Sequence, residues 1–154
     1  METKKVSDEL SVSGQVTADQ VADLAAQGFK SIICARPDGE APDQPTFAEI
    51  EAAAKAAGLE AAYVPITGPA AAQDQDAHDF AQAMEMLPKP VFGYCRTGMR
   101  AVTMWSLSQA VVGRSTFEIL QAAKNAGFDM SGVARRIENG GKIPTDAEEA
   151  HHDI

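Results

Sequence analysis

The sequence has few residues that could hold a metal ion or cross-link the chain. It contains two cysteines and three histidines in 154 residues, too few for a disulfide framework or a structural zinc site. Cys34 and Cys95 are therefore expected to be free thiols in a reducing compartment. His151 and His152 are interpreted as part of a polar terminal segment, and no metal or cofactor is expected.

Long apolar runs and positive charge are also scarce. No run of about 18 apolar residues occurs, so no membrane span is predicted, and the first eight residues lack the apolar stretch of a secretion signal, which favours the cytoplasm. The net charge is -9. Such a surface repels nucleic acid and anionic lipid, so neither is an expected partner. The expected partner is a small anionic substrate that is captured locally, and the oligomeric state stays open.

The chain does contain short apolar runs that alternate with amphipathic stretches. The apolar runs predict strands over residues 10–13, 30–35, 62–66 and 90–94. Three further sites carry Ser or Thr with Gln or Glu three residues later, the pattern of a helix N-terminus; these are Thr17, Thr46 and Ser115. Additional helices are predicted over residues 74–87, 101–112 and 131–139.

Strands that alternate with helices predict an α/β fold with a central, mostly parallel sheet of about four strands flanked by helices. The length fits one domain, expected over residues 1–140, with an acidic, disordered tail over 141–154. Ligands of such folds bind outside the carboxyl ends of the strands. Two chemically rich loops follow predicted strands, one over residues 36–40 and one over residues 95–100.

The loop over residues 95–100 is the strongest candidate for chemistry. Its backbone N–H groups can surround an anion where the next helix begins. Gly98 permits a tight turn, and the guanidinium of Arg100 can bind two oxygens of a tetrahedral oxyanion. The positive potential of these N–H groups and of the guanidinium would also stabilise a thiolate at Cys95. One loop could therefore activate a nucleophile and bind the group that it attacks. The alternative is an inert buried cysteine, which is the preferred interpretation of Cys34.

Two segments, residues 94–101 and 33–38, resemble the phosphatase-like domain of the beta-lactamase hydrolase-like proteins, and the similarity extends over about residues 10–139. The resemblance implies a fold similar to that of dual-specificity tyrosine phosphatases. Members of the family are also labelled sulfurtransferases, because their loop looks like that of rhodaneses.

The resemblance also implies roles for individual residues. Cys95 would be the nucleophile and Arg100 the oxyanion-binding arginine. The loop residues between them would form the anion-binding cradle; these are Arg96, Thr97, Gly98 and Met99. Arg36 and Asp38 match the second loop of the family and would line or brace the pocket. An ion pair that stabilises the turn is the alternative role for these two residues.

The sequence departs from tyrosine phosphatases in three respects. Four residues separate Cys95 from Arg100, one fewer than in those phosphatases and the number typical of rhodaneses. Tyr94 and Ala101 stand where phosphatases usually have His and Ser or Thr. A phosphatase also needs an acid for the leaving alkoxide, and no motif selects one. Asp74 and Asp76 are the candidates, although Asp74 could equally be a helix N-cap.

Three functions follow from these features. The first is a cysteine-dependent phosphatase that acts on a phosphate ester through a phosphocysteine at Cys95. The second is a rhodanese-like sulfurtransferase that carries sulfane sulfur as a persulfide on the same residue. The third is a non-catalytic domain that binds an oxyanion or senses redox state. The whole-chain resemblance favours the first function, and the short loop favours the second.

Overall fold

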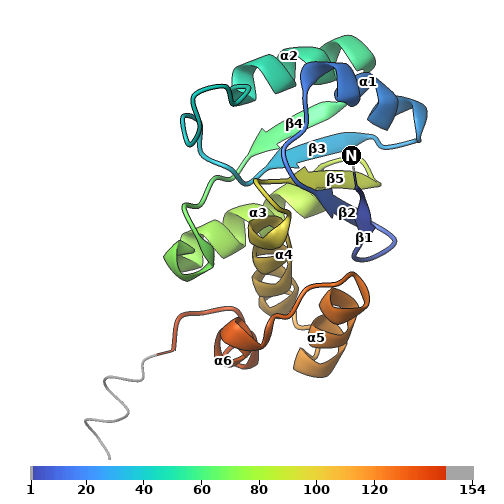
Figure 1. The fold of residues 1–154 in the computed structure, drawn as a ribbon. Helices are drawn as coiled ribbons and strands as arrows, with labels where there is room; N and C mark the ends of the chain where they lie inside the picture. The colour runs from blue at the N-terminus through green and yellow to red at the C-terminus, as the bar shows by residue number, and fades with distance from the viewer. Residues whose placement is uncertain (1, 145–154) are drawn as a thin grey trace, which may run out of the picture.

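A computed structural model describes residues 2–144 of the chain, and its centre is a five-stranded sheet in the order β1-β2-β5-β3-β4 (Figure 1). Strands β2, β5, β3 and β4 are parallel, and β1 pairs with β2 in the antiparallel sense. The predicted α/β fold with a mostly parallel sheet is therefore confirmed. The strands are β1 (Lys4–Lys5), β2 (Leu10–Ser13), β3 (Ser31–Cys34), β4 (Glu60–Tyr63) and β5 (Val91–Tyr94).

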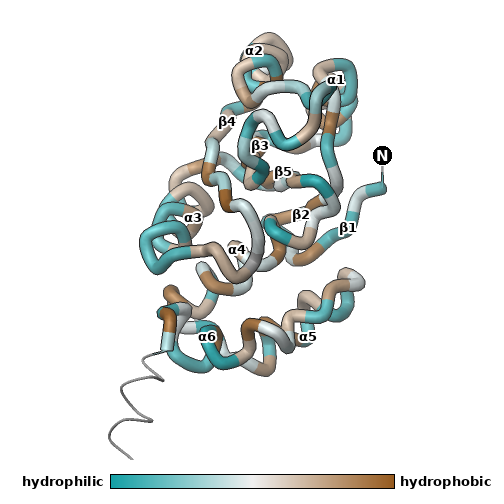
Figure 2. Tube along the Cα trace, turned by 60° about the vertical axis from the view of Figure 1, so that its left-hand side comes forward, coloured by the Kyte–Doolittle hydropathy of each residue, from teal (hydrophilic) through white to brown (hydrophobic). Residues whose placement is uncertain are grey.

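Helices cover both faces of this sheet. α1 (Ala18–Ala26) and α2 (Phe47–Ala57) pack together on one face, whereas α3 (Asp74–Met86) and α4 (Met99–Val111) lie on the other (Figure 1). α5 (Thr116–Asn125) and α6 (Ala134–Glu138) pack against α4 and form an outer layer. Figure 2 shows the same two groups of helices from another side. Within residues 2–144, no helix has the length and apolar character needed to cross a bilayer.

The predicted helix starts are confirmed at Thr17, Thr46 and Ser115. Each side chain accepts a hydrogen bond from the backbone N–H three residues later. At Thr17 the bond is reciprocated by Gln20, whose side chain accepts from the N–H of Thr17 at 2.9 Å. Short polar N-caps of this kind satisfy backbone donors that have no partner inside the helix.

Several bounds differ from the prediction by one to three residues, and one strand was not predicted. β4 is formed by residues 60–63; the apolar residues Val64 and Ile66 lie just beyond it, although their N–H groups still donate to the carbonyls at the end of β3. β1 was not predicted because its two lysines carry no apolar pattern. Within the predicted tail of residues 141–154, the N–H of Ile143 donates to Asp74 at 2.8 Å. Residues 145–154 lie outside the described residues, so the tail stays a prediction.

The core consists of two apolar clusters, one on each face of the sheet. All four residues of β5 are buried, because this strand lies between β2 and β3 and is covered on both faces. α4, which follows β5 directly, is buried over most of its length, and its Trp105 is 1% exposed. The segment that joins β5 to α4 is therefore anchored at both ends in the most buried part of the domain.

Candidate active site

Three loops meet at the carboxyl edge of the parallel strands and line a cavity of about 690 Å³. The loop after β3 contributes Arg36, Glu40 and Ala41, and the loop after β4 contributes residues 67–68. The remainder of the wall comes from the loop over residues 95–100, which we call the cysteine loop; these residues are Arg96, Thr97, Met99 and Arg100. The cavity wall thus contains five of the ten residues that the sequence singled out. The other five do not line it; these are Asp38, Asp74, Asp76, Cys95 and Gly98.

Cys95 lies at the base of the cysteine loop and is 0% exposed. Its Sγ accepts a hydrogen bond from the backbone N–H of Gly98 at 3.0 Å. Gly98 has φ 95°, a left-handed conformation that L side chains rarely adopt. Within residues 2–144, the N–H groups of Arg96 and Thr97 have no hydrogen-bond acceptor. The loop therefore aims one amide at the sulfur and keeps two more donors available to an anion.

Arg100 is held by a residue that the sequence did not single out, Glu40. The Arg100 Nη1 donates to Glu40 Oε2 at 2.7 Å, and its Nη2 donates to Oε1 at 2.8 Å. Nη1 also donates to the carbonyl of Ile66 at 2.9 Å. The same carboxylate accepts from the Nε of Arg36 at 2.9 Å, and Arg36 donates to Gln15 at 3.0 Å. Glu40 thus pairs with two arginines that are 6% and 8% exposed.

A count of donors shows what Arg100 has left for a ligand. A guanidinium has five N–H donors, and Glu40 and the carbonyl of Ile66 occupy three of them. The other two, on Nε and Nη2, lie on one edge of the planar group, and a side-chain hydrogen bond between Arg100 and Cys95 contributes to the raised pKa of the guanidinium. Such an edge matches two oxygens of an oxyanion. Glu40 therefore fixes the arginine and leaves this edge outside the ion pair, beside the sulfur of Cys95.

The electrostatics of this cluster are consistent with the geometry. Hydrogen bonds from Arg100, followed by those from Arg36, lower the pKa of Glu40 to about 2 in spite of partial burial. The hydrogen bond to Glu40 raises the pKa of Arg100, and the nearby Cys95 acts in the same direction. Glu40 is therefore an anion, and Arg100 a cation, across the whole physiological pH range.

Glu40 was missed because its main partner is 60 residues away in the sequence. A weaker signal was present. Arg36 and Glu40 are four residues apart in a loop that follows one strand, and the parallel topology brings that loop to the same edge as the cysteine loop. Asp38, which was predicted to line or brace the pocket, is not part of the cavity wall. Its Oδ1 accepts from the N–H of Phe47 at 2.8 Å and stabilises the start of α2.

The two candidate acids make hydrogen bonds away from the cavity wall. Asp76 accepts from the N–H of Gln73 at 2.8 Å, which makes Gln73, and not Asp74, the N-cap of α3. Asp74 accepts from the N–H of Ile143 and lies 3.5 Å from Arg136. Neither aspartate lines the cavity. Their role as general acids stays a prediction.

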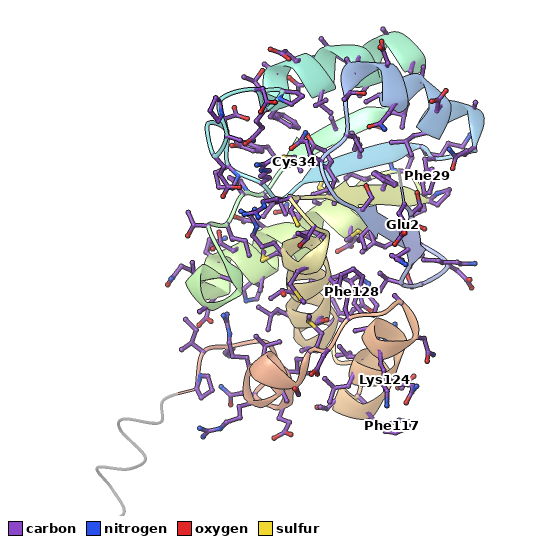
Figure 3. All side chains as sticks on the ribbon, in the orientation of Figure 1. Glu2, Phe29, Cys34, Phe117, Lys124 and Phe128 are labelled. Carbon is purple, nitrogen blue, oxygen red and sulfur yellow. The ribbon has the colours of Figure 1, made fainter. Side chains whose placement is uncertain are left out.

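Cys34 lies at the end of β3 and is 2% exposed (Figure 3). Its thiol donates to the carbonyl of Arg36 at 3.2 Å, and burial raises the pKa of the thiol. A neutral, packed thiol of this kind behaves as a small apolar side chain. The structure is consistent with the interpretation of Cys34 as a core residue.

Gly14 fixes the position of the cysteine loop. A Cβ at residue 14 would lie 2.7 Å from the carbonyl oxygen of Arg96, so Gly14→Ala must displace one of the two backbones. We expect a loss of about 1–3 kcal/mol in the free energy of unfolding, measured by chemical denaturation. Gly132→Ala is the control, because an added Cβ there has no neighbour within 4 Å. Equal stability of the two variants would show that the contact does not constrain the loop.

Comparison with known proteins places this chain in a family. The profile of the beta-lactamase hydrolase-like protein, phosphatase-like domain, matches residues 2–112. The chain belongs to this family. A beta-lactamase hydrolase-like protein of Agrobacterium fabrum is 38% identical over 139 residues, which cover 90% of this chain and 32% of that relative. The chain thus spans about a third of the length of the curated relatives that it matches.

Solved structures extend the comparison of this phosphatase-like domain. A candidate phosphatase from Neisseria meningitidis is 33% identical, with a TM-score of 0.77, over 89% of this chain and 96% of its own. PTPMT1 is 16% identical, with a TM-score of 0.68, over 97% of this chain and 99% of its own. At that identity the second likeness shows the fold alone. The domain therefore has the cysteine-phosphatase fold that the sequence predicted.

Proposed function

We propose that the domain hydrolyses phosphate monoesters through a phosphocysteine on Cys95. The observation that carries this proposal is the edge of Arg100 that lies outside its pairing with Glu40 and beside the sulfur, in a loop where the N–H groups of Arg96 and Thr97 have no acceptor within residues 2–144. Such donors stabilise the charge that develops on the three equatorial oxygens during phosphoryl transfer. The phosphatase-like family and the similarity to a candidate phosphatase support the same reaction.

The reaction has two steps. The Cys95 thiolate attacks phosphorus, an S–P bond forms, and the ester P–O bond breaks as the leaving alkoxide takes a proton from a general acid, for which Asp74 and Asp76 are the candidates. Water then attacks the phosphocysteine, the S–P bond breaks, and phosphate and the thiolate are released. Because Cys95 is 0% exposed, side chains of the loop must shift before the sulfur can reach phosphorus.

Turnover of an aryl phosphate tests the proposal, and Arg100→Lys is the informative variant. Lysine keeps the charge but loses the two-donor edge and the fixed pairing with Glu40. We expect kcat/KM to fall at least tenfold, about 1.4 kcal/mol or more of transition-state stabilisation. Arg114→Lys is the control, because Arg114 is exposed and its nearest carboxylate, that of Glu118, lies at 3.7 Å. Unchanged turnover in Arg100→Lys would show that Arg100 does not hold the oxyanion.

Sulfur transfer is the second candidate function, favoured by the four residues between Cys95 and Arg100. A shorter loop makes a smaller cradle, and transfer of sulfane sulfur from thiosulfate needs no acid because sulfite leaves readily. The same purified protein, given thiosulfate and cyanide, separates the two functions. Release of thiocyanate without hydrolysis of the aryl phosphate would replace the phosphatase proposal. Absence of both activities would support a non-catalytic anion-binding domain.

A further inference from the structure

The cavity wall carries more positive charge than a single phosphate group requires. Its charged residues are Arg36, Arg96, Arg100 and Glu40, an excess of two positive charges, in a chain whose net charge is -9. A concentration of arginine in an acidic protein marks the place where anions are captured against the overall field. A cavity of about 690 Å³ is large enough for a small molecule.

The three arginines differ in how far they are already paired. Arg36 donates to Glu40 and Gln15, and Arg100 donates to Glu40 and a backbone carbonyl. The guanidinium of Arg96 has no acceptor within residues 2–144, and Arg96 is exposed at the cavity. Arg96 is therefore the arginine of the cavity wall whose donors are all available to a ligand.

The backbone holds this unpaired side chain next to the nucleophile. Arg96 follows Cys95 directly, and its carbonyl oxygen packs so closely on Gly14 that no Cβ fits between them. The point from which the side chain of Arg96 leaves the loop is thus fixed relative to the sulfur. In the proposed reaction, the loop amides and Arg100 bind the phosphate that is transferred, which leaves the guanidinium of Arg96 for another part of the substrate.

We propose that Arg96 binds a second anionic group of the substrate, so that the preferred substrates are small phosphate esters that carry a further phosphate or carboxylate. This inference rests on the proposed phosphatase function and adds the class of substrate to it. A carboxylate or phosphate at Arg96 would gain charge-assisted, bidentate hydrogen bonds that a singly anionic ester cannot make.

The test compares two aryl phosphates of nearly equal size, 4-carboxyphenyl phosphate and its neutral counterpart 4-carbamoylphenyl phosphate. The readout is the ratio of their kcat/KM values, because this ratio cancels any general effect of a variant on the loop. We expect Arg96→Ala to lower the ratio at least fivefold, Arg96→Lys to retain more of it, and Arg114→Ala, at an exposed site outside this cavity, to leave it unchanged. Equal losses on both substrates in Arg96→Ala would overturn the proposal.

A binding measurement separates failure of this inference from failure of the proposed function. In Cys95→Ser protein, where no phosphocysteine can form, calorimetry compares inorganic pyrophosphate with inorganic phosphate. We expect pyrophosphate to bind at least fivefold more tightly, and we expect the added Arg96→Ala change to remove that advantage. If neither ester is hydrolysed but this pattern holds, the anion site stands and the phosphatase function falls. Equal affinity for the two anions would refute the role of Arg96.

Discussion

Replacement of Cys95 by serine is expected to lower phosphate-ester turnover by roughly a thousandfold or more, as the loss of a catalytic nucleophile does in other enzymes. A serine hydroxyl is not ionised near neutral pH, and this site offers no base to activate it. Within residues 2–144 no histidine or carboxylate hydrogen-bonds to residue 95; its Sγ accepts from the N–H of Gly98 and has a hydrogen bond with Arg100, and neither group is a base. The measurement is steady-state hydrolysis of an aryl phosphate.

Cys34→Ser is the matched control, because it makes the same chemical change at the other cysteine. Cys34 donates to a carbonyl and does not line the cavity, so turnover should stay within about threefold once folding has been verified by thermal denaturation. Trapping of a phosphorylated wild-type protein by rapid acid quench would identify the intermediate directly. Substantial residual turnover in Cys95→Ser would exclude Cys95 as the nucleophile.

Glu40→Gln is expected to have the largest effect on stability at the site. It leaves Arg36 and Arg100 buried without their counter-charge, a loss that costs about 3–5 kcal/mol when an ion pair is fully buried. The side chain of Glu40 is 26% exposed, so we expect a smaller loss, about 2–3 kcal/mol in the free energy of unfolding. Turnover should fall as well, because the amide nitrogen of glutamine cannot accept a hydrogen bond, so Arg100 loses its paired contact with both oxygens of residue 40. Chemical denaturation and kinetics measure the two effects.

The pH dependence of that loss identifies its cause. The carboxyl of Glu40 has an ordinary pKa of 4.5 when unfolded and about 2 in the folded domain. A lowered folded pKa stabilises the fold fully above the unfolded value, and the contribution disappears as the pH falls through 4.5 towards 2. The difference in stability between the wild type and Glu40→Gln should therefore be constant above about pH 5.5 and shrink below pH 4.5.

Glu118→Gln provides the comparison for an exposed pair. Glu118 lies 3.7 Å from Arg114 on the surface of α5 and is 59% exposed, so its loss should cost less than about 1 kcal/mol. If Glu40→Gln were no more destabilising than Glu118→Gln, the pairing of Glu40 with the two arginines would be energetically unimportant, and the fixed edge of Arg100 would need another explanation.

The elements that the sequence predicted well are those whose signal is local. The apolar run before Cys95 and the polar N-caps at Thr17 and Thr46 each depend on a few neighbouring residues, and the structure confirms them. Glu40 depends instead on a contact across the fold, which no window of sequence contains. β4 was misplaced for a similar reason, since its pairing with β3 decided the boundary and the apolar residues Val64 and Ile66 did not.

In the candidate site, too, residues with a local sequence signal were predicted and residues that depend on contacts across the fold were not. Gly98 and Arg100 could be selected because a strand, a cysteine, a glycine and an arginine at short spacing form a local pattern. The capping role of Asp76 and the contact of Asp74 with Ile143 could not be predicted, because they depend on which N–H groups end up nearby. Asp38 was predicted to line or brace the pocket, but it does not line the cavity, and its carboxylate stabilises the start of α2.

The position of β5 has a consequence for how proteins built on this scaffold can diverge. The cysteine follows the central strand by a single peptide bond, and Glu40 from the loop after β3 holds Arg100, whereas residues 67–68 lie in the loop after β4 and contact neither residue through a hydrogen bond within residues 2–144. Insertions or exchanges at residues 67–68 can therefore reshape the entrance without disturbing the nucleophile or Arg100. The fold therefore separates the residues that reactivity requires from a loop that can vary between proteins with different substrates.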